Sequence, residues 1–298
     1  MLNCVGLEPG EGLEAAFGVA AAQGIEWLEL FHGVNWTEED AEQVIAEVAA
    51  HGLRLSSVDA LSQLYRRTPR AADRNQQLLL RQIEVAAAAG APYVITYFGH
   101  AGERDDRRAI HVYLERLAPC LEQAEQANVT ILLENEFDAA CVDPNGSDIT
   151  RRPEVVRELI ERAGSARFRT NFDPSNYHFA GVEPFPYAYE VLEDLIEYVH
   201  VKDGHRLSPF GSAPDSELWD RARDGPDREY AWCRVGEGAV NWDGLLRALE
   251  RRGYSGFIAV EPHSRRPHAE EAWRQSIEFV RARVPDTAAG RVALGPGR

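Results

Sequence analysis

The chain has 298 residues, of which 44% are hydrophobic, and 32 basic residues stand against 48 acidic ones, a formal net charge of −16 at pH 7. One domain of this length can bury a large core. The acidic balance argues against tight binding to a phosphate backbone, which needs clustered lysine and arginine, so we expect no nucleic acid partner.

The cysteines and the apolar runs limit the cellular setting. Cys4, Cys120, Cys141 and Cys233 are scattered and form no Cys-x-x-Cys pair, so they predict neither a disulfide framework nor a thiolate metal site. The N-terminus has no basic segment followed by an apolar run, and no stretch of about 18 apolar residues occurs. We expect a cytoplasmic protein that has no membrane partner.

Short apolar runs alternate with longer helix-like segments eight times along the chain. The runs that predict strands lie at residues 2–6, 27–31, 53–58, 93–97, 129–133, 168–172, a stretch that ends at 200, and 257–260. The segments that predict helices lie at about 11–23, 37–52, 69–89, 107–127, 153–163, 187–196, 243–252 and 269–283. Gly24, Gly52 and Gly90 are typical helix stops. A long polar loop is expected after residue 200.

Strands that alternate with helices at this spacing predict βαβ units and a parallel sheet. Eight units favour a single (β/α)8 TIM barrel, an α/β fold, over an open doubly wound sheet. No Gly-x-Gly-x-x-Gly turn follows the first strand, so a dinucleotide-binding domain has no support. We expect residues 1–284 to form this domain and residues 285–298 to form a flexible C-terminal tail.

Four successive predicted strands end in a residue that can bind a hard metal ion. Glu134 follows the fifth strand, Asp173 the sixth and Glu261 the eighth, while His200 ends the seventh. Since consecutive strands of a barrel are neighbours and end at one face, these side chains can converge on one centre. Three carboxylates and one imidazole predict one divalent ion, Mn²⁺ before Mg²⁺, Co²⁺ or Zn²⁺.

Five motifs occur in order along the chain. They are Leu-Leu-Glu134-Asn, Asn-Phe-Asp173-Pro-Ser-Asn176, His200-Val-Lys202-Asp203, Gly236-Glu-Gly238-Ala-Val-Asn-Trp242 and Gly253-Tyr-Ser-Gly256-Phe-Ile-Ala-Val-Glu261. Together they resemble the xylose isomerase-like TIM barrel superfamily, the sugar phosphate isomerase/epimerase family related to the ketose 3-epimerases. The resemblance covers nearly the whole chain. It implies that the Glu, Asp, His and Glu hold one divalent cation and that both glutamates exchange protons with the substrate.

Four residues are expected to bind substrate. Asn176 stands where the ketose 3-epimerases have a histidine that touches substrate, and it can hydrogen-bond a hydroxyl group but cannot titrate. Arg206 matches a clamp for a substrate hydroxyl or carboxylate group. Lys202 either contacts substrate or forms a salt bridge with Asp203 or a neighbouring glutamate. His100 follows the fourth strand and is expected to line the pocket.

Several further residues have a structural interpretation beside a functional one. Glu29, within the second strand, is expected to satisfy a buried neighbour or an arginine at the rim. Glu136 either binds substrate or is solvated. Trp219, Tyr230 and Trp232 either cap a ring-shaped substrate, pack within their loop or contact a second subunit, which leaves a homo-oligomer open.

This ligand set suits proton abstraction next to a carbonyl. A cation bound to the carbonyl and an adjacent hydroxyl oxygen acidifies the carbon between them, and two glutamates on opposite sides act as base and acid. Returning the proton to the other face epimerises, and returning it to the neighbouring carbon isomerises. We therefore expect an isomerase or epimerase of a ketose or cyclitol that works through a metal-stabilised enediolate, with Glu134 and Glu261 as the catalytic pair.

The main alternative is a dehydratase or lyase of the same superfamily, since expelling a β-hydroxyl group from the same intermediate dehydrates. Inosose dehydratase, 3-dehydroshikimate dehydratase and a C-glycoside-cleaving subunit are the models for it. A catalytically weak binding protein is a third option, against which four intact ligands argue. A three-zinc abasic-site endonuclease is disfavoured, because Val58-Asp59-Ala60 ends the third strand and Asn176 replaces a required histidine.

Overall fold

The computed structural model of the chain describes residues 2–6, 13–31, 38–100, 105–137, 148–207, 219, 221–223, 229–264 and 268–284. The predicted tail at 285–298 lies outside the described residues. So do much of the polar loop predicted after residue 200 and the predicted starts of the first two helices.

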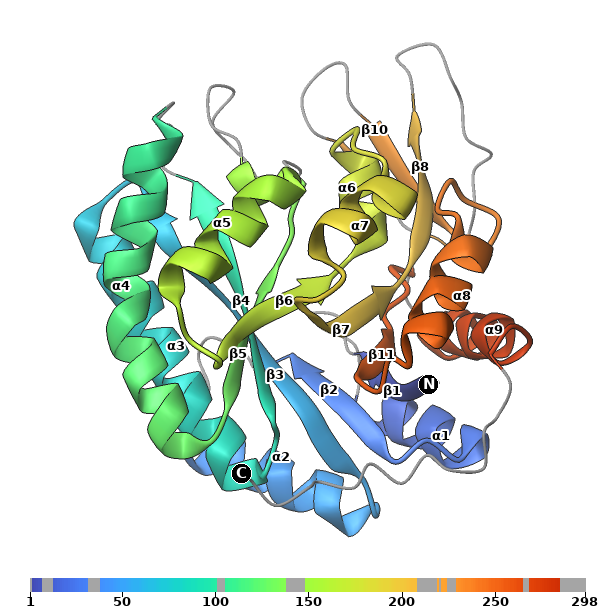
Figure 1. Cartoon of the computed structure of the whole chain (residues 1–298). Coiled ribbons are helices and arrows are strands. Elements are labelled where there is room, and N and C mark those ends of the chain that lie inside the picture. Colours follow the sequence, from blue (N-terminus) through green and yellow to red (C-terminus); the bar gives the residue numbers. More distant parts are fainter. Residues whose placement is uncertain are drawn as a thin grey trace.

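Eight parallel strands form a closed barrel (Figure 1). Its strands are β1 Leu2–Gly6, β2 Trp27–Phe31, β3 Arg54–Arg66, β4 Tyr93–His100, β5 Thr130–Glu134, β6 Phe168–Phe172, β7 Ile196–Val201 and β11 Phe257–Val260. They pair in the order β1-β11-β7-β6-β5-β4-β3-β2, and the pairing of β1 with β2 closes the ring. The predicted (β/α)8 TIM barrel is confirmed.

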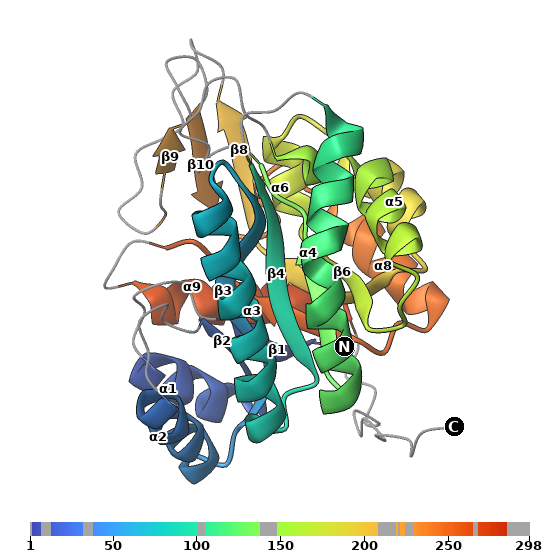
Figure 2. The ribbon, with the colours of Figure 1, turned by 90° about the vertical axis from the view of Figure 1, so that its left-hand side faces the viewer.

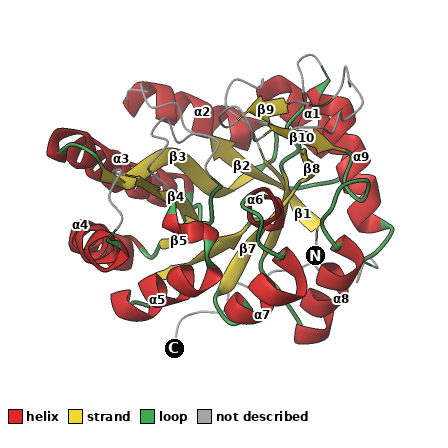
Figure 3. Ribbon diagram, turned by 90° about the horizontal axis from the view of Figure 1, so that it is seen from above, coloured by secondary structure: helices red, strands yellow, loops and turns green. Residues whose placement is uncertain are grey.

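Helices surround the ring of strands when the barrel is seen from above, and one short helix lies over its middle in this view (Figure 3). They are α1 Leu13–Gln23, α2 Glu38–Ala50, α3 Pro69–Ala89, α4 Asp106–Ala127, α5 Pro153–Ala163, α6 Pro174–Phe179, α7 Tyr189–Leu192, α8 Trp242–Arg252 and α9 Ala269–Arg281, with a 3₁₀ turn at Ile149–Arg151 and a π turn at Pro184–Ala188. Helix α3 keeps its predicted bounds because Thr68 caps its start and Gly90, in the left-handed conformation, ends it. In the described part of the chain, no helix has both the length and the apolar composition to cross a bilayer.

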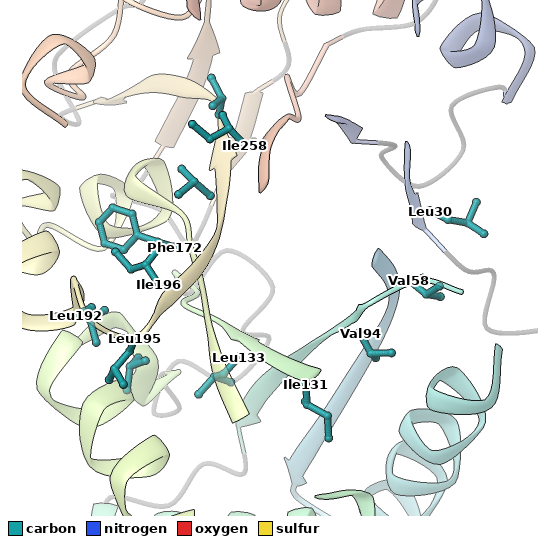
Figure 4. Close-up of a cluster of buried hydrophobic side chains, with 14 of the residues drawn as sticks. Leu30, Val58, Val94, Ile131, Leu133, Phe172, Leu192, Leu195, Ile196 and Ile258 are labelled. Carbon is teal, nitrogen blue, oxygen red and sulfur yellow. The ribbon is translucent and has the colours of Figure 1, made fainter. Parts of the chain in front are cut away.

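Strand alternation divides the buried side chains into two sets. Outward-facing residues such as Leu133, Phe172 and Ile258 pack against the helices in the main core (Figure 4). Inward-facing residues near the strand starts, such as Leu132 and Tyr198, form a separate apolar cluster inside the barrel. The next inward positions along the strands therefore lie nearer the carboxyl end, above an apolar floor.

Strands β3 and β4 extend beyond their predicted ends. The pairing of β3 with β4 is irregular between Asp59 and Gln63, where Leu61 has a φ of +50°. Beyond this irregularity Gln63 to Arg66 pair with Tyr97 to His100. The left-handed residue interrupts the alternation that predicts a strand, and only the pairing with β4 makes this segment regular again.

The segment after β7 contains a small antiparallel sheet where a loop was predicted. Its strands are β8 Asp203–Leu207, β9 Arg221–Arg223 and β10 Glu229–Cys233, in the order β8-β10-β9. Figure 2 shows them standing together at one end of the barrel. Trp219, Tyr230 and Trp232 are buried in one apolar cluster with Phe137, Phe179 and Ala272, so they pack against other segments of the chain. The alternatives of a substrate cap and of a contact with a second subunit stay predictions.

The start of β7 also differs from the prediction, because tertiary pairing overrides local helix propensity. Only Tyr189–Leu192 of the predicted helix at 187–196 is α-helical, and Ile196 pairs with Thr170 as the first residue of β7.

Asp203 organises the Gly236-Glu-Gly238 motif. One carboxylate oxygen accepts from the amides of Gly204 and Val240 at 2.9 and 3.2 Å, and the other from those of Gly236 and Gly238 at 2.9 and 3.2 Å. A side chain at Gly238 would collide with the Asp203 carboxylate, so glycine is required there. The buried carboxylate thus ties β8 to the turn that leads into α8.

Replacing Asp203 by alanine should lower the free energy of unfolding by about 3 kcal/mol, because four backbone N–H groups lose their acceptor and an unsatisfied buried group costs about 1–3 kcal/mol. Urea unfolding measures this change. Asp203→Asn, which keeps one acceptor oxygen, should lose less. Wild-type stability in Asp203→Ala would contradict the assignment.

Candidate metal centre and active site

The four strand-end residues meet at the carboxyl end of the barrel. Glu134 ends β5, Asp173 follows β6, His200 lies in β7 and Glu261 follows β11. One potential ligand atom from each lies within 4.8 Å of those from the other three, and all four residues are buried. The convergence expected from the strand order is present.

Asp173 is oriented by helix α6. Its Oδ1 caps the helix by accepting from the amides of Ser175 and Asn176 at 2.8 and 3.0 Å. The backbone amide of Asp173 donates to Asn135 Oδ1 at 2.9 Å. Oδ2 accepts no hydrogen bond of good geometry, although Lys202 Nζ lies 2.8 Å away as an ion-pair partner. The cap therefore leaves one carboxylate oxygen available to a cation.

His200 presents its two ring nitrogens to different groups. Nδ1 lies 2.9 Å from Glu261 Oε2, 3.3 Å from Glu134 Oε1 and 4.0 Å from Asp173 Oδ2. Nε2 lies 3.0 Å from Glu29 Oε2. Burial lowers the pKa of His200, but the negative charges of Glu261, Glu29 and Glu134 outweigh it and hold that pKa well above its usual range.

The two glutamates of the cluster have different electrostatic surroundings. Burial raises the pKa of Glu134, and the nearby His200 and Lys202 only partly oppose it. Burial acts the same way on Glu261, but His200 and Lys202 outweigh it and hold the pKa of Glu261 well below its usual range. Asn171 Nδ2 donates to Glu134 Oε2 at 3.0 Å, and Asn176 Nδ2 lies 3.3 Å from Oε1.

Lys202 places its ammonium group among the carboxylates. Nζ lies 2.8 Å from Asp173 Oδ2, 2.9 Å from Glu261 Oε2 and 4.0 Å from Glu134 Oε1. It also lies 3.3 Å from His263 Nε2. The salt bridge considered for Lys202 is therefore present with Glu261 and Asp173, whereas Asp203 is occupied by backbone amides.

The donor set fits a divalent cation. Three carboxylates and one imidazole surround a common point, and the oxygen-rich set matches hard or borderline divalent ions. Asp173 Oδ2 accepts no hydrogen bond from the described residues but faces the Lys202 ammonium at 2.8 Å, so this point already accommodates a positive charge.

The predicted substrate-binding residues are placed at different distances from this cluster. Asn176 lies within it and is buried, and its Oδ1 has no hydrogen-bond partner among the described residues. Arg206 is exposed on β8, where its guanidinium lies against Gly181, and none of its contacts with described residues reaches the four ligands. His100 is half-buried at the end of β4, opposite Arg66.

Asn171 contacts Glu134 and His200, and His263 contacts Lys202, although neither was assigned a role from the sequence. Both Asn171 and Glu29 follow the inward alternation of their strands: Glu29 comes two residues after the inward Trp27, and Asn171 two residues before Asp173. This period of two is the sequence signal that could have identified Asn171 and Glu29 as inward-facing residues.

Asp59 and Tyr97 form another buried polar pair. The Tyr97 hydroxyl hydrogen-bonds the Asp59 carboxyl group, which also accepts from the Leu61 amide at 2.9 Å. Burial, and then the charge of Glu134, raise the pKa of Asp59 well above its usual range. The pair is therefore coupled electrostatically to the cluster.

Comparisons with known proteins agree with this architecture. The profile of the family described as xylose isomerase-like TIM barrels matches residues 17–283. A comparison with curated protein sequences gave no significant match.

Three solved structures share the fold at low sequence identity. The 3-keto-D-glucoside 4-epimerase from E. coli is 13% identical, with a TM-score of 0.70 over 95% of this chain and 100% of that one. A D-tagatose 3-epimerase-like protein is 18% identical, with a TM-score of 0.69 over 95% and 99%. The probable 3-DHS dehydratase of petrobactin synthesis from Bacillus anthracis is 16% identical, with a TM-score of 0.68 over 94% and 98%.

Binding of a divalent ion should release a proton from His200. Because Glu261, Glu29 and Glu134 overcome the effect of burial and raise its pKa, the imidazole is protonated near neutral pH, and an ion at Nδ1 must displace that proton. The apparent affinity for Mn²⁺ should therefore rise with pH below this pKa, by about tenfold per pH unit for one proton.

Calorimetry in buffers of different ionisation enthalpy measures the protons released. His200→Ala should bind the ion more weakly and release fewer protons. Wild-type affinity that stays constant between about pH 6 and 8 would contradict this prediction.

Proposed function

Because the chain belongs to the xylose isomerase-like TIM barrel family, we propose that it is a divalent-metal-dependent isomerase or epimerase of a ketose or cyclitol. The observation that carries this proposal is the convergence of Glu134, Asp173, His200 and Glu261 within 4.8 Å at the carboxyl end of the barrel. Catalytic groups of TIM barrels lie at that end.

The four residues would hold one divalent ion, Mn²⁺ in our proposal. When bound, such an ion polarises a carbonyl group and an adjacent hydroxyl group and so acidifies the carbon between them. Asn171, through Glu134, and the N-terminus of α6, through Asp173, would keep the ligand atoms aimed at that point.

Glu134 and Glu261 would transfer the proton. One has a pKa above its usual range because burial dominates, and the other has a pKa well below it because His200 and Lys202 outweigh burial. Two carboxyl groups biased toward opposite protonation states are what an acid–base pair requires. Proton removal by one and return by the other, on the opposite face or the neighbouring carbon, would epimerise or isomerise the substrate.

Substrate contacts in this proposal come from Asn176, Lys202, Arg206 and His100. Asn176 Oδ1, which has no partner in the part of the chain that the structure describes, is a buried acceptor suited to a substrate hydroxyl group. Arg206 and His100 stay predictions, as do the cytoplasmic location and the choice of Mn²⁺.

A dehydratase is the second candidate, and one observation favours it. The Lys202 ammonium lies 2.9 Å from Glu261 Oε2, close enough to the proposed proton-transfer group to protonate a departing hydroxyl group. Elimination would then start from the same deprotonated carbon.

Incubation with ketoses and inososes in D₂O separates the two candidates. Metal-loaded protein should catalyse the entry of deuterium at the carbon next to the carbonyl and the formation of a new sugar isomer. NMR spectroscopy measures both. Exchange accompanied by an unsaturated product and loss of water would contradict the isomerase assignment and support the dehydratase. Absence of exchange with every substrate would contradict both.

Glu134→Gln and Glu261→Gln should each lower kcat by at least about 10²-fold at saturating metal, because each removes one proton-transfer group. Glu197→Gln is the matched control, since Glu197 lies on β7 and pairs with Arg169 away from the cluster. Its kcat should stay close to that of the wild type. Full activity of either cluster variant would contradict the assignment of that residue.

A further inference from the structure

We propose that Glu29 is a positioning residue of the metal centre, which fixes the tautomer and orientation of His200. Glu29 lies on β2, and its side chain is 1% exposed. Its Oε2 lies 3.0 Å from His200 Nε2, although 171 residues separate the two along the chain. The inference rests on the proposed metal-dependent function.

The two ring nitrogens of His200 face different groups, the carboxylates of the cluster at Nδ1 and Glu29 at Nε2. Nδ1 faces the three carboxylates of the cluster, so it is the nitrogen that can bind an ion. A neutral imidazole carries one proton, and an ion at Nδ1 requires that proton to be on Nε2. A carboxylate oxygen accepts hydrogen bonds, so Glu29 Oε2, 3.0 Å from Nε2, favours the Nε2–H tautomer.

Because Asn171 can donate to either ring nitrogen of His200, both neutral tautomers of His200 are possible. Its Nδ2 lies 3.2 Å from Nδ1 and 3.1 Å from Nε2 of His200, and an amide nitrogen can only donate. Without the acceptor at Glu29, Asn171 could donate to an unprotonated Nε2. The remaining proton would then be on Nδ1 and would block the ion.

Glu29 itself is held by a second layer of hydrogen bonds. The Ser57 hydroxyl donates to Glu29 Oε2 at 3.1 Å, and the Tyr198 hydroxyl lies 3.3 Å from Ser57 Oγ and 2.9 Å from Ser56 Oγ. The ring of Tyr198 also packs edge-on against that of His200, with centroids 5.7 Å apart. All these side chains are buried, so the arrangement is rigid.

A simpler explanation is that Glu29 contributes only negative charge. Three substitutions separate charge from hydrogen bonding. Glu29→Leu removes both, Glu29→Gln removes the charge but keeps an acceptor oxygen, and Glu29→Asp keeps the charge but is one methylene too short to reach Nε2. If Glu29 positions His200, Glu29→Leu and Glu29→Asp should weaken metal binding about 10- to 100-fold, and Glu29→Gln should weaken it less.

Two measurements test this pattern. Calorimetric titration with Mn²⁺ gives the dissociation constant for each variant. Long-range ¹H–¹⁵N NMR of histidine-labelled protein without added metal, recorded at a pH above the His200 pKa so that the imidazole is neutral, gives the tautomer of His200, which is assigned among the nine histidines by comparison with His200→Asn. The wild type should show a proton on Nε2, and Glu29→Leu should show loss of that single state. Thermal unfolding verifies that each variant is folded, and Glu29→Asp and Glu29→Gln carry the test if Glu29→Leu does not fold.

The outcomes are distinct. If Glu29→Gln and Glu29→Leu lose Mn²⁺ affinity equally while Glu29→Asp loses none, only the negative charge of Glu29 acts, and the inference is overturned. Wild-type affinity and an Nε2–H tautomer in all variants would overturn it as well, while leaving the proposed function intact. A wild-type protein that binds no divalent ion would overturn the proposed function together with the inference.

Discussion

The central constraint on this structure is the mutual repulsion among three carboxylates that are buried around one point. Like charges at this separation, away from water, repel far more strongly than at a surface. The Lys202 ammonium offsets the repulsion from Asp173 and Glu261, and His200, whose pKa the surrounding carboxylates raise, lies 3.3 Å from Glu134. A site that needs a cation for its own stability is already prepared to bind one, because binding replaces a costly arrangement with a better compensated one.

The barrel lets this arrangement persist. Glu134, His200 and Glu261 each come two residues after an inward residue of the apolar floor, Leu132, Tyr198 and Ala259, whereas Asp173 comes two residues after the polar Asn171. Backbone amides of α6 orient Asp173, side-chain amides orient Glu134, and Glu29 faces the far nitrogen of His200. Preorganisation of this kind spares a site the free energy of rearranging when its ligand arrives.

Local sequence patterns report burial and chain reversal, and they predicted the parts of the fold that depend on those two properties. Leu132 before Glu134 and Tyr198 before His200 show the inward alternation, and Gly90 marks a helix end that the structure confirms. The extension of β3 past Leu61 and the sheet of β8, β9 and β10 were not predicted. Both depend on pairing with distant segments, which composition does not reveal.

The sequence by itself determined the eight βα units and the order of four potential ligands along successive strands, because strand ends in a barrel share one face. Only the tertiary structure decided which groups those ligands contact. Lys202 could have paired with the adjacent Asp203, yet it reaches Glu261 and Asp173 while Asp203 binds the Gly236–Gly238 turn. Glu29 meets His200 across the barrel, since barrel closure and strand register bring together residues that no local pattern connects.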